Sequence, residues 1–169
     1  MTEFESDRVL LLSDTEDPER ARLALAMGFV QRAEFKRKYP ATMKPAEFID
    51  AIIATVLQTS AVDLAADKET LLALLEDPNA GRAAILTRLA TRSEIVDAQY
   101  NQTLVQFQYF AFYRRDPDDA GFTSWLTQLK NKPLRDAGAA RLMVCSFINS
   151  EEYQARFGIL TTHTTRECN

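Results

Sequence analysis

The stretch Leu104–Leu129, LVQFQYFAFYRRDPDDAGFTSWLTQL, decides the fold of this chain. From Leu104 to Tyr113, apolar side chains fall on nearly every side of a helical wheel, and a helix that is apolar all round is a buried one. The second half instead carries one apolar stripe at i, i+3, i+4 and i+7, which is typical of an amphipathic helix. That stripe consists of Phe122, Trp125, Leu126 and Leu129. The stretch therefore predicts two paired helices joined by a tight turn.

The predicted turn between these helices consists of charged residues and one proline. Arg114 and Arg115 fall in the predicted last turn of the first helix, where positive charge suits the helix dipole. Pro117 restricts the residue before it to an extended conformation, so the helix must stop at Asp116. We expect Asp116 to cap the second helix, with Pro117 at its first position and Asp118–Asp119 adding negative charge to its first turn.

Two ligand-binding interpretations compete with this structural one. Asp116, Asp118 and Asp119, followed by Gly121, could ligate calcium, which takes several hard oxygen ligands around a sharp turn. The loop lacks the alternating ligands and the terminal Glu of an EF-hand, and each aspartate already has a capping role. The aromatic cluster could also stack against a glycan, although aromatic side chains at helical spacing usually form a core. Capping and core packing are therefore the preferred interpretations.

Composition and charge narrow the class of protein. The 169 residues are 46% hydrophobic with only 5 Gly and 6 Pro, which favours a helical globular chain over a loop-rich or disordered one. A net charge of −4 argues against a nucleic-acid-binding surface. The one basic run, Lys36–Lys38, is predicted to be a solvated helix face. No segment reaches the roughly 18 apolar residues of a membrane span, and MTEFESDR lacks the features of a signal peptide.

The residue types that usually carry catalysis are sparse. Cys145 lies among apolar residues on a predicted helix and is expected to be a small core residue, whereas Cys168 and the single histidine, His163, lie in a polar tail. There is no Cys-x-x-Cys, nucleophile–base pair or phosphate-binding loop in the sequence. We therefore expect no catalytic site and no bound cofactor. A glycosidase-like enzyme built from paired carboxylates is the remaining catalytic alternative.

The chain repeats part of its pattern. The segment FVQRAEFKRKYP (29–40) aligns without gaps to FINSEEYQARFG (147–158), and LATRSEI (89–95) is a fainter third copy. In the third copy, Thr91 and Glu94 have the spacing of a capping box, which Asn149 and Glu152 repeat.

The opening half of the unit repeats as well, because residues 48–63 occupy the place of 104–119. Repeats of this size indicate stacked helical units. We predict an all-α fold, a compact bundle of two degenerate repeat units and the end of a preceding one. The expected divisions are 1–40, 41–101, 102–158 and a flexible tail, 159–169.

The second of these units resembles a bacterial repeat family called "domain of unknown function 4214". The resemblance rests on an aromatic helix, an Arg-x-Pro-Asp-x-x-Gly turn, a Trp-bearing helix and a closing Phe-Ile-x-Ser-x-Glu-Tyr helix. It is specific over about 102–158 and degenerate in the first unit, where Thr59–Val62 replace the turn and Trp is absent. It implies a helical fold similar to phycobilisome linker domains and a non-enzymatic module of a secreted or surface-attached bacterial protein.

These observations lead to one functional expectation with alternatives. We expect a non-catalytic helical repeat module that packs against neighbouring units or other proteins, or that acts in adhesion. A calcium- or glycan-binding surface module built on Asp116, Asp118 and Asp119 is the first alternative, and the carboxylate enzyme is the second. Localisation outside the cell or at its surface is implied by the family resemblance alone.

Overall fold

The computed structural model describes residues 7, 9, 17–76, 81–157 and 168. Over these residues every regular element is a helix, so the predicted all-α class is confirmed. None of the helices in this part of the chain combines the length and the apolar character needed to cross a membrane.

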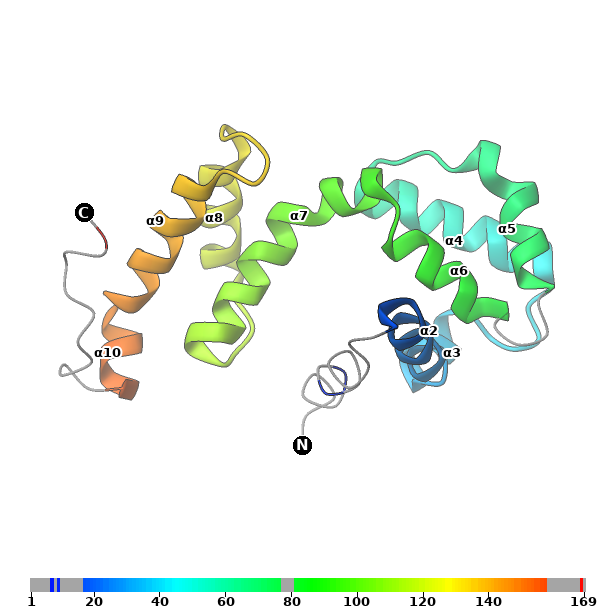
Figure 1. The fold of residues 1–169 in the computed structure, drawn as a ribbon, viewed down its shortest axis with the longest axis horizontal. Helices are drawn as coiled ribbons and strands as arrows, with labels where there is room; N and C mark the ends of the chain where they lie inside the picture. Colours follow the sequence, from blue (N-terminus) through cyan, green and yellow to red (C-terminus); the bar gives the residue numbers. More distant parts are fainter. Residues whose placement is uncertain (1–6, 8, 10–16, 77–80, 158–167, 169) are drawn as a thin grey trace. The chain divides into compact units, whose positions relative to one another are not determined.

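The chain divides into two compact units, one ending at Ala98 and the other beginning at Gln99. The first unit includes α2 (Pro18–Phe29), α3 (Ala33–Lys38), α4 (Pro45–Ser60), η1 (Ala65–Asp67), α5 (Lys68–Leu75) and α6 (Gly81–Ala90). The division falls within α7 (Ser93–Gln108). The second unit continues with η2 (Tyr109–Tyr113), α8 (Asp119–Lys130), α9 (Ala137–Ile148) and α10 (Glu151–Phe157) (Figure 1). The helices before residue 40 thus pack in the same unit as those that follow them, while the repeat boundaries themselves stay predictions.

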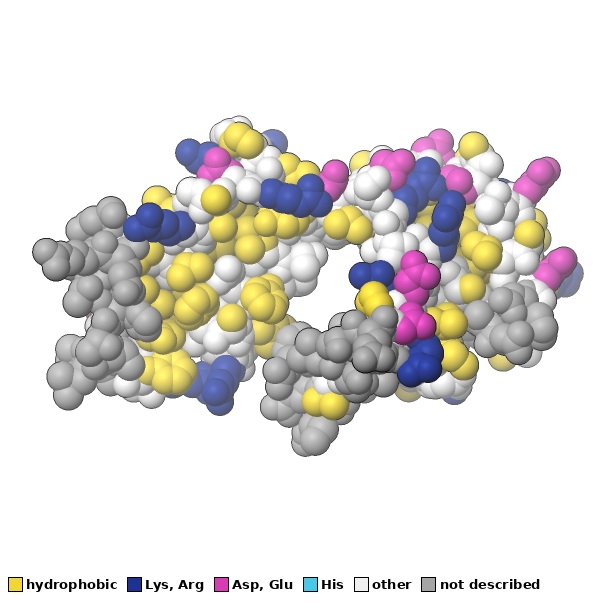
Figure 2. Space-filling model, viewed as in Figure 1, with side chains coloured by type: hydrophobic (Ala, Val, Ile, Leu, Met, Phe, Trp, Pro, Cys, Tyr) yellow, Lys and Arg dark blue, Asp and Glu magenta, His cyan; other side chains and the backbone are white. Residues whose placement is uncertain are grey.

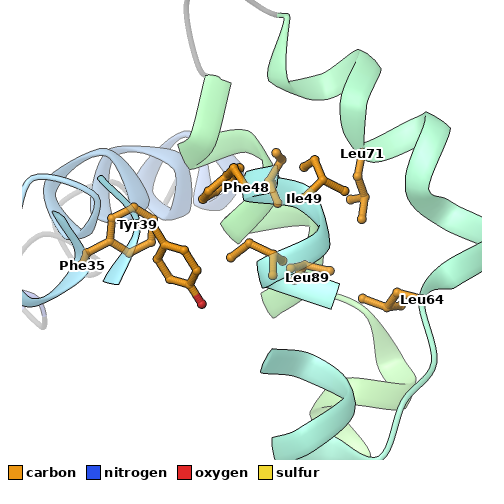
Figure 3. Packing of buried hydrophobic residues seen from close by; sticks show 9 residues of the cluster. Phe35, Tyr39, Phe48, Ile49, Leu64, Leu71 and Leu89 are labelled. Carbon is orange, nitrogen blue, oxygen red and sulfur yellow. The ribbon is translucent and has the colours of Figure 1, made fainter. Parts of the chain in front are cut away.

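The core of the first unit is built from α3, α4, α5 and α6. Phe48 and Ile49 on α4 are fully buried. Phe35 on α3 and Tyr39, the residue after α3, meet Phe48 at ring-centroid distances of 6.4 and 5.5 Å. Leu64, Leu71 and Leu89 bring the connecting segment, α5 and α6 to the same cluster (Figure 3). The repeated segment 29–40 therefore contributes Phe35 and Tyr39 to the core.

The second unit has a separate core around Phe147 on α9. Tyr109 meets the Phe147 ring edge-on at 4.9 Å and Tyr113 stacks on it at 4.6 Å. Trp125 and the rest of the predicted α8 stripe pack against this cluster, with Leu129 the most buried of the four. The prediction of two paired helices in Leu104–Leu129 is confirmed. The prediction that the first of them is buried on all sides is wrong, because Phe107 and Phe110 are exposed.

The break between the paired helices is longer than predicted, from Arg114 to Asp118, so the prediction that Arg114 and Arg115 lie in the last helical turn is wrong. The aromatic helix ends with the π-helical turn η2, and Arg114 follows in the left-handed conformation at φ 51°. The second helix begins at Asp119 with Asp118 as its N-cap, so the prediction that Asp116 caps it is wrong. The reason is geometric: the left-handed residue redirects the chain before Pro117, which leaves Asp118 as the residue beside the free N–H groups of α8.

The caps of three other helices were compared with the sequence pattern at their starts. Asp17 caps α2 before Pro18 by accepting a hydrogen bond from the Arg20 amide at 2.9 Å. The cap of α10 is Ser150, whose hydroxyl accepts from the Tyr153 amide at 3.2 Å, one residue after the predicted Asn149. The Thr91 hydroxyl donates to the Thr87 carbonyl at 2.9 Å, so the predicted capping box at Thr91 is also wrong.

The repeated segments break at corresponding positions. The first of them passes from α2 to α3 between Phe29 and Ala33, and the last passes from α9 to α10 between Ile148 and Glu151. The middle copy passes from α6, which ends at Ala90, to α7, which begins at Ser93. The sequence repeat is thus matched by helix–break–helix elements at the same spacing.

The cysteines differ from the expectation. Cys145 is half-buried and forms a disulfide with Cys168, with 5.5 Å between the two Cα atoms. The prediction of Cys145 as a small core residue is therefore wrong, and its bond to Cys168 was not predicted. An apolar helix face and a distant polar tail carry no pairing signal when each holds a single cysteine.

Candidate functional site at the Asp-Pro turn

The three aspartates singled out by the sequence lie at the exposed turn between η2 and α8. The Asp118 carboxylate accepts a hydrogen bond from the Gly121 amide at 2.8 Å, and this contact fixes the start of α8. Asp116 lies in the turn itself and contributes its backbone carbonyl, while Asp119 is the first residue of α8. All three side chains are exposed.

Arg115 is the centre of this turn, and its role was missed by sequence reasoning. Its guanidinium donates two hydrogen bonds to the Glu152 carboxylate, Nε to Oε1 at 2.7 Å and Nη2 to Oε2 at 2.8 Å. Its third nitrogen, Nη1, donates to the Asp116 carbonyl at 2.9 Å and reaches the Asp118 carboxylate at 3.4 Å. One arginine therefore connects the turn, the cap of α8 and the first turn of α10.

Two tyrosines form the floor beneath Arg115. The guanidinium carbon lies 5.2 Å from the Tyr109 ring centroid and 5.4 Å from that of Tyr113, within the range of cation–π attraction. The Tyr113 hydroxyl donates to Ser150 at 2.8 Å, and Arg156 donates to the Tyr113 carbonyl at 2.6 Å. The aromatic residues at the turn are thus buried support for an arginine, which leaves little of their faces for a glycan.

Gly121 is required by the same arrangement. A Cβ atom at this position would fall on the Tyr109 hydroxyl and lie 3.2 Å from the capping carboxylate oxygen of Asp118. The tyrosine is 5% exposed and is held by its ring contacts, so it has little room to move away. The glycine that suggested a calcium loop in the sequence therefore has a packing explanation.

The hydrogen bonds and burial at this turn shift the pKa values of its ionisable side chains. The Gly121 amide hydrogen bond is the main cause that lowers the pKa of Asp118, and hydrogen bonds from Arg115 lower the pKa of Glu152. The same pair with Glu152 raises the pKa of Arg115, while burial raises the pKa of Tyr109. All these directions favour a charged Arg–Glu–Asp cluster with a neutral tyrosine beneath it at neutral pH.

This geometry limits what the turn can do chemically. Calcium prefers several carboxylate oxygens free to converge on it, whereas Asp118 already serves an amide and a guanidinium. Among the described residues, no group of three or more Asp, Glu, His and Cys side chains is placed to hold a metal ion. The arrangement is a structural one, in which the Arg115 guanidinium joins the starts of α8 and α10. His163 lies outside the described residues.

A related cluster occurs in the first unit. Arg92 forms an ion pair with Asp67, the residue before α5, and its Nε lies 3.4 Å from the Glu94 carboxylate in the first turn of α7. Asp67 and Glu94 lie at the starts of helices, as Asp118 and Glu152 do in the second unit. The arginine comes from a different place in each unit. Both clusters link the start of one helix to the start of another, although no shared motif in the sequence pairs an arginine with either acid.

Comparison with known proteins gives no assignment: no family model, curated protein or solved structure matches this chain significantly. The resemblance to the bacterial repeat family therefore stays a prediction.

Proposed function

We propose that this chain is a non-catalytic helical repeat module of a larger bacterial secreted or surface protein, and that it acts by packing against neighbouring units or another protein. The family resemblance of residues 102–158 supports the class of protein. The Asp-Pro turn supports the structural role, because Arg115 already pairs with Glu152 and Asp118.

The observation that carries the proposal is a pair of exposed aromatic side chains on the second unit. Phe107 is 56% exposed and Phe110 is 37% exposed, while Val105 and Tyr109 between and beside them are buried. Residues three apart are neighbours on a helix surface, so the two rings present one apolar patch. Hydrophobic side chains also gather over this unit in the space-filling view (Figure 2). Apolar patches of this kind commonly mark protein-interaction surfaces.

The disulfide supports the secreted or surface location. Disulfides form and persist in oxidising compartments and are rare in the cytosol, where thiols are kept reduced. Cys145 and Cys168 are 23 residues apart in sequence, so their bond closes a substantial loop. A module at the cell surface gains stability from such a bond.

Sedimentation equilibrium over a range of protein concentrations tests the proposal. We expect the full chain to self-associate as concentration rises, because the aromatic patch is available to a second copy when its normal neighbour is absent. Changing Phe107 and Phe110 to Glu should abolish the association. The matched control changes two exposed glutamines of the same helix, Gln102 and Gln106, to Glu and should leave it intact. A wild-type chain that stays monomeric up to millimolar concentration would contradict the proposed role of the patch.

A further inference from the structure

The disulfide of the second unit faces an open cavity instead of the core. The cavity has a volume of about 580 Å³, which lies within the range of small-molecule binding sites. One wall is formed by α9, which contributes Arg141, Cys145 and Asn149, and Cys168 lines the cavity beside the disulfide. Both halves of the bond therefore border space that a small molecule can enter.

The two faces of α9 keep this cavity apart from the core. Met143 and Phe147 are 0% and 1% exposed and belong to the core cluster. Leu142 is 59% exposed and lines the cavity together with Cys145, which follows it by about one helical turn. Cys145 and Cys168 are only half-buried. Accessible disulfides are the ones that exchange with thiols, so this bond can be attacked while the core stays closed.

Arg141 places a positive charge in the cavity. It precedes Cys145 by four residues, a spacing that makes two side chains neighbours on a helix surface. Among the described residues that line the cavity, none carries a carboxylate. A nearby cation stabilises thiolates, and disulfide exchange involves two of them, the attacking thiol and the leaving sulfur. The cavity therefore favours an anionic thiol, and Asn149 adds an amide that suits the polar groups of a small peptide.

We propose that the Cys145–Cys168 disulfide is an exchange site for small anionic peptide thiols. The incoming thiol loses its proton to water, and its sulfur attacks the Cys168 sulfur. A mixed disulfide forms on Cys168 while the bond between the two cysteines breaks. The electron pair of the broken bond remains on Cys145 as a thiolate beside Arg141. One disulfide is exchanged for another, so the thiol is the only co-reactant.

This exchange makes the link between Cys168 and α9 conditional. The link persists where thiols are scarce and opens where they are abundant. The site uses neither Phe107 nor Phe110, so the inference goes beyond the proposed function and stands apart from it.

Reaction of the folded full chain with glutathione tests the proposal. Samples are quenched with N-ethylmaleimide over time, and peptide mapping by mass spectrometry locates both labels. In the initial phase we expect glutathione on Cys168 and the maleimide on Cys145. The rate should not change with urea below the unfolding transition, because the folded chain reacts. A rate that rises steeply with urea would show that the bond opens only after unfolding, which would overturn the proposal. Glutathione on Cys145 instead would overturn the assigned direction of attack.

The charge of the cavity is tested by one substitution and a matched control. Arg141→Gln should slow the reaction with glutathione by about two- to fivefold, the effect of losing one exposed ion pair. The reaction with 2-mercaptoethanol, which carries no carboxylate, should slow less. Lys130→Gln removes an exposed cation of the same unit that does not line the cavity, and it should leave both rates unchanged. Equal rates in Arg141→Gln and Lys130→Gln would contradict the role of Arg141.

A second pair of variants keeps the test decisive if Arg141→Gln alters the fold. Ser146→Phe places a ring in the cavity, and Thr127→Phe places the same ring at an exposed position of α8. Each native hydroxyl donates to the carbonyl four residues earlier in its own helix, so the two losses are equivalent. We expect Ser146→Phe to slow exchange with both thiols and Thr127→Phe to react at the wild-type rate. Equal exchange in these two variants would show that the thiol does not enter the cavity and would overturn the proposal.

Discussion

At the scale of single residues, Gly121 shows how closely the second unit is packed around its turn. A methyl group at this position would overlap the hydroxyl of the buried Tyr109. We expect Gly121→Ala to lower the free energy of unfolding by about 1–3 kcal/mol, the usual cost of overpacking. Gly28→Ala is the control, because no atom lies within 4 Å of a Cβ at that helical position. That substitution should be neutral or stabilise the chain by about 0.5–1 kcal/mol. A stable Gly121→Ala chain would show that Tyr109 moves freely.

The pair of Arg115 and Glu152 gives the turn a pH dependence. Arg115 lowers the pKa of Glu152 below its unfolded value, so the stabilisation is present above about pH 4 and is lost as the pH falls through the folded pKa. Both side chains are partly exposed, which limits the contribution to about 0.2–1 kcal/mol. The difference in unfolding free energy between wild type and Arg115→Gln should therefore shrink between pH 6 and pH 3. Denaturant titrations at each pH measure it, and a difference that stays constant would mean that Arg115 acts by packing alone.

At the scale of helices, the start of α8 separates two aspartates that look alike in sequence. Asp118 caps α8 through the Gly121 amide, whereas the Asp116 side chain is exposed in the turn before it. We expect Asp118→Ala to cost about 0.5–2 kcal/mol of stability, the usual value of an N-cap, and Asp116→Ala to change it by less than about 0.5 kcal/mol. Chemical denaturation of the two variants tests this. The opposite order would restore Asp116 as the cap.

The same helix shows why part of the fold could be predicted and part could not. The stripe from Phe122 to Leu129 and the Asp17-Pro18 helix start depend on neighbours within one or two turns, so local spacing is sufficient to predict them. The position of the Asp118 cap depends on the left-handed Arg114, a conformation that non-glycine residues rarely adopt and that no local pattern announces.

The candidate site is harder still to predict, because its main contact joins residues far apart. Arg115 and Glu152 are 37 residues apart in sequence, and the cysteines are 23 apart. Each of these residues also has a plausible local role, so the sequence does not indicate its distant partner. Arg115 lies near a helix end, Glu152 lies in the first turn of a helix, and Cys145 lies on an apolar face. The aspartates of the turn were found from the sequence, but the pairing of Arg115 with Asp118 and Glu152 was not.

At the scale of the whole molecule, the disulfide should stabilise one unit and not the other. Both cysteines belong to the second unit, and a loop of this length gives about 2–4 kcal/mol in the chain-entropy model. Trp125, the single tryptophan, reports on that unit alone. We expect Cys168→Ser to lower the denaturant midpoint seen by tryptophan fluorescence while the exchange protection of α4 is unchanged. Loss of protection in α4 would show that the disulfide stabilises both units.

The central claim is that the chain folds as two helical units, each around its own core. The most direct test compares one cavity-forming substitution in each core, Ile49→Ala in the first and Met143→Ala in the second, both at fully buried positions. Each should destabilise its own unit by about 2–5 kcal/mol. Unfolding followed by Trp125 fluorescence should shift in Met143→Ala and remain at the wild-type midpoint in Ile49→Ala, although far-UV circular dichroism detects both changes. Equal shifts of the fluorescence transition in the two variants would contradict the claim and indicate a single cooperative core.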